Sequence, residues 1–249
     1  MTPGSTSRGE LDDHGKILLL WDIDRTLIYV GEVDRAVYRE AFQEVVGRPA
    51  VRFPARGTGV TMPRAIRGLL LDNGLSDGET QRLLPRMLEL VPERLAAHED
   101  DVRRDGVLLP GALEAAAAVA ADGRFVATVV TGNLEANARL KLRAFGLDRY
   151  IDPDLGGYAS DDEHRPALVA VAQKRAAARR GGRFTRANTV IVGDSLEDVR
   201  TGIEGGARVI GVAGGRTSAS ALREAGADVV LADLTDVNRL MKAIVSLRS

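Results

Sequence analysis

The sequence predicts an α/β fold in which a parallel sheet carries an inserted helical segment. Three apolar runs, at residues 17–21, 125–130 and 189–192, have the composition of buried strands, and each is followed directly by polar residues. From residue 110 onward such runs alternate with helical stretches, which is the pattern of parallel sheets. Between residues 34 and 109 the apolar residues instead follow helical spacing, with almost no strand signal.

The elements after residue 110 can be assigned in order. Gly111 precedes an alanine-rich helix, Gly146 ends the next helix, and Pro166 suits the first turn of a third. The expected helices span residues 112–121, 134–145 and 165–179. The expected strands span residues 17–21, 125–130, 189–192, 209–212 and 229–231. We therefore expect a core sheet of five strands or slightly more.

The apolar residues of the interval 34–109 fall on three predicted helices. They recur every three or four residues, which places them on one face of each helix. The three groups are Val37, Ala41 and Val45; Ile66, Leu69 and Leu70; and Leu83, Met87, Leu90 and Val91. We expect a loose tail at residues 1–15, an α/β core at 16–33 and 110–249, and an inserted helical domain at 34–109.

The composition limits the functions open to the chain. Its 249 residues carry a formal net charge of −1, so nothing indicates a nucleic-acid partner. There is no cysteine, which excludes disulfides, thiolate metal sites and thiol nucleophiles. No apolar stretch is long enough to cross a bilayer, and residues 1–15 lack the apolar region of a secretory signal. We therefore expect a cytoplasmic protein with no membrane partner.

The predicted strand at 17–21 ends on two carboxylates separated by one residue, Asp22 and Asp24, and Thr26 follows them. Two like charges this close repel each other unless a cation or a shared proton relieves them. A metal site is the natural relief. The alternative is an ordinary turn in which Asp24 or Thr26 caps the next segment.

Two other predicted strands also end on polar groups. One runs into Thr131-Gly132-Asn133, and the other runs into Gly193-Asp194, with Asp198 four residues after Asp194. Ligands of open α/β sheets bind beyond the carboxyl ends of the strands. We therefore expect one pocket to collect all three groups, although Thr131-Gly132-Asn133 taken alone is also compatible with a plain turn and helix cap.

The order and spacing of these segments resemble those of the haloacid dehalogenase superfamily, from residue 17 to about residue 230. The superfamily's first motif is Asp-x-Asp-x-Thr, its second is a Ser or Thr that ends a strand, and its fourth is Gly-Asp-x-x-x-Asp. The resemblance implies a Rossmann-like three-layer core and makes the insert a helical cap of the type called C1, as in phosphoglycolate phosphatases. The chain departs from the pattern at Arg25, where glycine is usual.

The resemblance also implies catalytic roles. Asp22 would be the nucleophile that forms an aspartyl-phosphate, with a pure metal ligand as the alternative. Asp24 would protonate the leaving oxygen and then deprotonate water. A Mg²⁺ ion would be held by Asp22, the carbonyl of Asp24 and Asp194. Asp198 would lie behind these ligands, unless it is an ordinary acid on the surface of a helix.

Four residues are expected to bind the phosphorylated substrate. By the resemblance, the Thr131 hydroxyl would donate to a phosphoryl oxygen, and Gly132 and Asn133 would offer backbone donors near a helix start. Thr26, which closes the first motif, is placed beside them.

Two cations are assigned with less support from the motifs. The third motif is normally a lysine, and we assign it to Arg165, which precedes Pro166 where the family often has Lys-Pro; Lys174 is the alternative. Arg56 lies in a segment rich in Gly, Pro and Thr at residues 53–62, and is a candidate contact for the leaving group. An ordinary loop between two helices explains this segment equally well.

The resulting hypothesis is a Mg²⁺-dependent phosphatase that acts on a small phosphorylated metabolite, phosphoglycolate-like or a sugar phosphate. A mutase of the β-phosphoglucomutase kind and a catalytically silent binding protein remain alternatives, although the intact pair of Asp22 and Asp24 argues against a silent site. A dehalogenase is the weakest alternative, because it requires neither Asp24 nor magnesium. The sequence holds no P-loop and no Gly-x-Ser-x-Gly motif.

Overall fold

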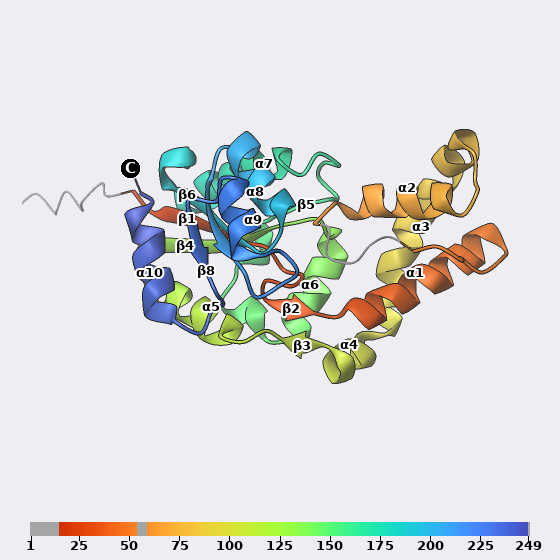
Figure 1. Ribbon diagram of the computed structural model, residues 1–249, viewed down its shortest axis with the longest axis horizontal. Coiled ribbons are helices and arrows are strands. Elements are labelled where there is room, and N and C mark those ends of the chain that lie inside the picture. Colours follow the sequence, from red (N-terminus) through yellow and green to blue (C-terminus); the bar gives the residue numbers. More distant parts are fainter. Residues whose placement is uncertain (1–14, 54–58, 249) are drawn as a thin grey trace, which may run out of the picture.

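The computed structural model describes residues 15–53 and 59–248, which form an α/β fold with a helical insertion (Figure 1). Six parallel strands build the sheet in the order β5-β4-β1-β6-β7-β8. Their bounds are β1 Ile17–Trp21, β4 Phe125–Thr131, β5 Gly157–Tyr158, β6 Thr189–Gly193, β7 Arg208–Val212 and β8 Val229–Leu231. β1 lies between β4 and β6, so the three strands that end on polar residues are neighbours.

Helices cover both faces of the sheet, which gives the core three layers. The core helices are α5 Ala112–Ala121, α6 Glu135–Ala144, α7 Ala167–Arg180, α8 Leu196–Gly205, α9 Ala219–Glu224 and α10 Val237–Ser246. Side chains of β1 alternate between the two faces. Ile17, Leu19 and Trp21 share one hydrophobic cluster with residues of α5 and α10, whereas Leu18 and Leu20 share another with residues of α7.

The insertion contains four helices, which lie together at one end of the molecule (Figure 1). Their bounds are α1 Gly31–Val46, α2 Met62–Asp72, α3 Asp77–Ala97 and α4 Glu99–Asp105. The antiparallel strands β2 Ile28–Tyr29 and β3 Val107–Leu108 pair where the insertion leaves and rejoins the core. α1 and α2 pack on α3, and α3 and α4 contact α6 of the core.

The predicted fold class is confirmed, and so are the helical faces of the insertion. Val37 of α1, Ile66 of α2 and Met87 of α3 are all buried. The sequence analysis missed β2, β3 and β5, which have two residues each. Strands this short contain no full period of alternation, so only their pairing with a neighbour defines them. It also missed α4 and gave no bounds for α8, α9 and α10. The predicted second core strand ended one residue before Thr131.

The insertion is docked against the carboxyl edge of the sheet. The backbone N–H of Met62 donates to the carbonyl of Gly132 at 2.7 Å, and the Thr61 hydroxyl donates to the carbonyl of Glu163 at 3.0 Å. A Cβ atom on Gly132 would lie 2.6 Å from the Val60 carbonyl oxygen, so a larger residue would push the two segments apart. The start of α2 therefore covers the edge of the sheet where the polar strand ends meet.

None of the helices within residues 15–53 and 59–248 combines the length and the apolar character needed to cross a membrane. 

His98 joins three helices of the insertion through two carboxylates. Its Nδ1 lies 2.6 Å from Asp101 of α4, and its Nε2 lies 2.9 Å from Glu40 of α1. Only the protonated ring can donate to both acceptors at once. The hydrogen bonds that the ring donates to Asp101 and to Glu40 outweigh the effect of burial, and the pKa of His98 is raised from its usual 6.5.

Replacing His98 should therefore weaken the fold in a pH-dependent way. A raised pKa in the folded state stabilises the protein fully below pH 6.5, and this stabilisation is lost as pH rises through the raised value. We expect His98→Gln to lower the free energy of unfolding by roughly 0.5 kcal/mol at pH 5.5, and by much less at pH 9. Urea unfolding at the two pH values measures this; an equal loss at both would contradict it.

Candidate active site

The first motif forms a tight turn after β1. The backbone N–H groups of Leu27 and Ile28 both donate to the Ile23 carbonyl, and that of Arg25 donates to the Ile28 carbonyl at 2.7 Å. Arg25 lies at φ 69°, and it is the one non-glycine residue with positive φ in the described part of the chain. This left-handed conformation costs a non-glycine residue roughly 1 kcal/mol. Arg25 therefore adds conformational strain at a position where glycine, which is usual in the family that the chain resembles, would carry little.

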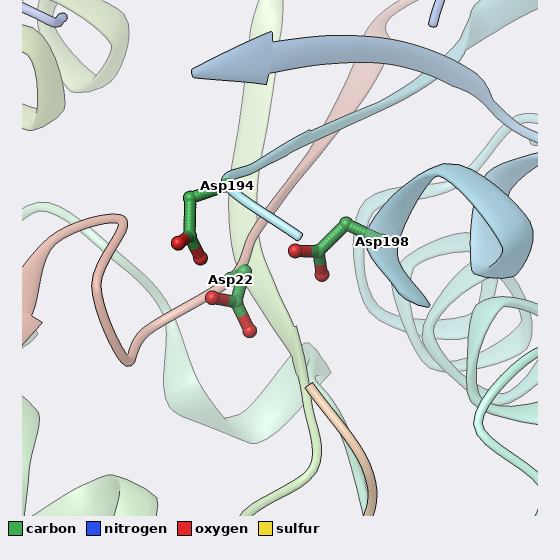
Figure 2. Close-up of side chains that lie close together, drawn as sticks. All are labelled: Asp22, Asp194 and Asp198. Carbon is green, nitrogen blue, oxygen red and sulfur yellow. The ribbon is translucent and has the colours of Figure 1, made fainter. Parts of the chain in front are cut away.

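Three carboxylates from separate segments meet at the carboxyl edge of the sheet (Figure 2). Asp22 follows β1, Asp194 follows the neighbouring β6, and Asp198 lies in the first turn of α8. One oxygen from each lies within 4.8 Å of the others, and all three residues are buried. Such a cluster is stable only if cations or protons neutralise most of its charge.

Arg165 neutralises two of the three carboxylates. Its guanidinium donates to Asp22 Oδ1 and to Asp198 Oδ1, both at 2.6 Å. The second oxygen of Asp198 accepts from the backbone N–H and the hydroxyl of Ser195, and the second oxygen of Asp22 accepts from the Thr26 hydroxyl at 3.1 Å. Asp198 is thus fully engaged by protein donors and helps to hold Arg165 against Asp22.

Asp194 is the carboxylate without a donor. Among the described residues none donates a hydrogen bond to it or forms an ion pair with it, yet Asp194 is only 3% exposed. Burial and the nearby Asp198 raise its pKa to about 7, although Arg25 and Arg165 act in the opposite direction. Burial, Asp198 and Asp194 likewise raise the pKa of Asp22 well above its usual value, against the lowering effect of Arg165. The negative charge of the site is therefore not fully compensated, and one more cation beside Asp194 would lower the repulsion.

The donor set fits a hard divalent cation. Such ions take oxygen ligands and retain waters, and here the free carboxylate of Asp194 lies beside Asp22 at the edge of a cavity. Within the described residues the cluster contains no His, and the chain contains no cysteine, so nothing favours a softer metal. Asp194 and Asp22 are the residues that would hold it.

A second charge network lies beside the first and is built on Lys141 of α6. Its ammonium donates to Asp24 Oδ1 at 2.8 Å, to Asp34 of α1 at 2.9 Å and to the Asn133 side-chain oxygen at 3.1 Å. Asn133 in turn donates to the other oxygen of Asp24 at 2.6 Å and to the Thr131 hydroxyl. Both oxygens of Asp24 are therefore held by cationic or amide donors, and Asp24 is not part of the three-carboxylate cluster.

Lys141 remains charged although its side chain is completely buried. Burial alone would lower its pKa, but the charges of Asp24 and Asp34 outweigh this effect and raise it. Burial also raises the pKa of Asp34, while Lys141 opposes the shift. Lys141 therefore links the first motif to the first helix of the insertion by a buried ion triad.

Sequence reasoning missed Lys141, although a signal was present. The lysine lies three residues after Ala138 and seven after Leu134, on the face of α6 that packs inward. A charged residue at such a position of an amphipathic helix requires a buried partner. Its partners come from segments more than 100 residues away, so the sequence offered no way to name them.

Most of the predicted site residues gather around one cavity. Asp22, Asp24, Thr131, Gly132, Asn133, Arg165 and Asp194 all line one cavity. Thr26 does not line it: it is buried beneath Asp22 and holds that carboxylate instead. Lys174 is exposed on α7, whereas Arg165 contacts Asp22, so the geometry favours Arg165 as the cation of the third motif. Arg56 lies outside the described residues.

The rest of the cavity is formed by the insertion and by the turn after β1. Its wall is largely aromatic and apolar, with two arginines. The residues are Arg25, Tyr29, Gly31, Asp34, Arg35, Tyr38, Phe53, Gly59, Val60, Met62 and Ala65. The carbonyl of Gly59 also accepts a hydrogen bond from Arg165, so the insertion and the cluster are linked directly. A ligand at Asp22 would thus be enclosed by both parts of the fold.

Comparison with known families agrees with this geometry. The model of the haloacid dehalogenase-like hydrolase family matches residues 19–202, which include both Asp22 and Asp198. The chain therefore belongs to the haloacid dehalogenase-like hydrolases, and its buried acidic triad is typical of the metal site of that family. No curated protein sequence matches the chain.

Solved structures share the whole fold at low sequence identity. A predicted phosphatase from Clostridium acetobutylicum is 16% identical, with a TM-score of 0.66, and the match covers 93% of this chain and 99% of that one. A provisionally named phosphoglycolate phosphatase from Lactobacillus plantarum is 17% identical, with a TM-score of 0.64 and coverage of 91% and 99%. A provisionally named β-phosphoglucomutase from Bacteroides vulgatus is 16% identical, with a TM-score of 0.62 and coverage of 94% and 91%. At these identities the likeness concerns the fold alone.

Neutralising Asp194 should stabilise the metal-free protein at alkaline pH. A carboxyl whose pKa rises from 3.8 to about 7 on folding binds a proton that the unfolded chain releases, so stability falls as pH rises between these values. We expect Asp194→Asn to be more stable than the wild type at pH 8 in a chelator by at least about 1 kcal/mol, and to lose this advantage at pH 4. Urea unfolding measures both; an unchanged difference across this range would contradict the argument.

Removing the ammonium of Lys141 should be severe, because it leaves two partly buried carboxylates side by side without their cation. We expect Lys141→Met to lower the free energy of unfolding by about 3 kcal/mol or more. The double variant Lys141→Met/Asp34→Asn should recover part of this loss, since one of the unpaired charges is gone. Thermal or urea unfolding of the four proteins in the cycle measures the coupling, and strictly additive effects would show that the triad is not an energetic unit.

Proposed function

We propose that this hydrolase is a Mg²⁺-dependent phosphatase that acts on a small phosphorylated metabolite through an aspartyl-phosphate on Asp22. The observation that carries the proposal is the position of Asp22. Its carboxylate is oriented by Thr26 and Arg165 beside the unpaired Asp194, at a cavity that Thr131 and Gly132 also line. We further propose that residues 34–109 act as a C1-type cap on a core formed by 16–33 and 110–249.

The first step would transfer the phosphoryl group to the protein. A carboxylate oxygen of Asp22 attacks phosphorus, the bond between phosphorus and the leaving oxygen breaks, and Asp24 supplies the proton that the leaving alkoxide takes. In the second step water attacks the phosphorus of the aspartyl-phosphate, Asp24 accepts the proton, and Asp22 is regenerated as phosphate leaves. A Mg²⁺ ion, when bound by Asp22, Asp194 and the Asp24 carbonyl, would neutralise charge on the phosphoryl oxygens.

The contacts of Arg165 and Thr131 support a role for both in binding the transferred group. Arg165 donates to Asp22, and a guanidinium has further N–H groups that match phosphoryl oxygens. Its Nε is buried without a partner among the described residues. The Thr131 hydroxyl accepts from Asn133, which leaves its own proton available for donation into the cavity.

Asp24 would need to exchange one of its present hydrogen bonds to act as an acid. Both of its oxygens accept from N–H donors, Lys141 on one side and Asn133 on the other. These donors stabilise the ionised carboxylate of Asp24, which is the form that accepts a proton from water. Because Lys141 also binds Asp34 of α1, a shift of the insertion would alter the contacts of Asp24 as well.

A phosphosugar mutase is the second candidate, because one structure with the same fold is provisionally named a β-phosphoglucomutase. The same residues would then form the aspartyl-phosphate, and the phosphoryl group would return to another hydroxyl of the sugar instead of to water. The product distinguishes the two reactions: a phosphatase releases inorganic phosphate, whereas a mutase yields an isomeric sugar phosphate.

Phosphate release from a panel of phosphorylated metabolites, with and without Mg²⁺, tests the proposal. We expect Mg²⁺-dependent release that falls by about 1,000-fold or more in Asp22→Asn, since the amide cannot serve as the nucleophile. Asp100→Asn is the matched control, because Asp100 of α4 is almost fully exposed and far from the cavity residues in the chain. Release that persists in Asp22→Asn, or none from any compound, would reject the phosphatase.

A further inference from the structure

We propose that the leaving group of the substrate carries an anionic group of its own, a carboxylate or a second phosphate, and that Arg25 and Arg35 bind it. The inference rests on the proposed function for the position of the transferred phosphoryl group. Both arginines line the same cavity as Asp22, one from the turn after β1 and the other from α1 of the insertion. Such a substrate would have an anion at each end.

The conformation of Arg25 is the first observation behind this proposal. Its backbone lies in the left-handed region, where glycine carries the least strain, and yet the residue has a long charged side chain. Strain of this kind persists at functional sites when the side chain has a role there. The guanidinium stacks over the ring of Tyr29, with its central carbon 4.5 Å from the ring centroid.

The surroundings of Tyr29 make room for this stack. The ring of Tyr29 lies so close to Gly31 that a Cβ atom on Gly31 would come within 2.7 Å of it. Any larger residue at this position would therefore displace the ring that supports Arg25. Tyr29, Gly31 and Arg25 all line the cavity, so the stack is part of its wall.

Arg35 is held in the same manner on the opposite part of the fold. Its guanidinium carbon lies 4.6 Å from the centroid of Phe53, and both residues line the cavity. Stacking on a ring fixes the plane of a guanidinium and leaves its N–H edge free to bind a planar anion in bidentate fashion. The guanidinium of Arg25 on the core and that of Arg35 on the insertion would both contact a ligand in the cavity beside Asp22.

The charge balance of the site leaves these two arginines in excess. Arg165 is paired with Asp22 and Asp198, and Lys141 is paired with Asp24 and Asp34. Within residues 15–53 and 59–248, neither the Arg25 nor the Arg35 side chain forms an ion pair or donates a hydrogen bond, and each guanidinium stacks on an aromatic ring. Asp194 attracts Arg25 without forming an ion pair with it, so an anion of the ligand would be the direct charged partner of each arginine.

The test compares esters that differ in one anionic group. 3-Phosphoglycerate and glycerol 3-phosphate differ in a carboxylate, and fructose 1,6-bisphosphate and fructose 6-phosphate differ in a phosphate. For at least one pair we expect kcat/KM to be about tenfold or more higher for the member with the second anion, and the pair that shows it identifies the anion. Equal kcat/KM within both pairs, in an enzyme that does release phosphate, would overturn the proposal and leave the phosphatase intact.

Two variants and a matched control connect any preference to the arginines. We expect Arg25→Gly, which also relieves the left-handed strain, and Arg35→Ala to reduce the preference to less than about threefold. Arg39→Ala is the control: Arg39 lies one turn after Arg35 on α1 and also near the Phe53 ring, but it is exposed and does not line the cavity. It should keep the full preference. A preference that survives in Arg25→Gly and Arg35→Ala would contradict the assignment.

A binding measurement keeps the inference testable without turnover. Phosphonoacetate and methylphosphonate are not hydrolysed by phosphatases, and they differ in one carboxylate. In the presence of Mg²⁺ we expect phosphonoacetate to bind the wild type at least about fivefold more tightly by calorimetry, and to lose this advantage in Arg25→Gly. If no ester is hydrolysed but this difference holds, the phosphatase fails and the anion site stands; equal binding by the wild type would reject the anion site.

Discussion

Repulsion among carboxylates at one edge of the sheet is the constraint on which the rest of the site depends. Asp22, Asp24, Asp34, Asp194 and Asp198 all lie at or beside this edge, and most of their surface is removed from water. Placing like charges so close together in a low-dielectric environment is unfavourable unless each gains a cation or a donor. The positions of Arg165 and Lys141 follow from this requirement.

The two buried cations divide the carboxylates into separate groups. Arg165 joins Asp22 to Asp198, and Lys141 joins Asp24 to Asp34, so the two aspartates of the first motif have different partners although one residue separates them. Asp194 remains unpaired beside Asp22, so a further cation would relieve the remaining repulsion at the site. In the proposed reaction this division also separates the nucleophile from the acid and base.

The same ion pairs tie the insertion to the core. Asp34 belongs to α1 and Lys141 to α6, while Arg165 donates to the carbonyl of Gly59 near the start of α2. Neutralising these carboxylates and holding the insertion against the core are therefore coupled, since movement of the insertion would expose or unpair charges in the core. Arg25 lines the cavity from the core and Arg35 lines it from the insertion. A ligand that binds both arginines would therefore stabilise the contact between the insertion and the core.

The sequence by itself determined the fold class and the polar residues that the core contributes to the cavity, but not the part of the wall formed by the insertion. Apolar strands buried on both faces and helices with one apolar face are local patterns, so β1, β4, β6 and helices α1, α2 and α3 of the insertion could be predicted. The same holds for the polar strand ends that parallel pairing brings together. Only the tertiary structure decided which charges are paired. Lys141 contacts Asp24 from 117 residues away, Thr26 lies behind Asp22 and not in the cavity, and Arg25 stacks on Tyr29 in a strained turn. These contacts depend on distances between segments and on burial, and no local pattern of residues encodes either one.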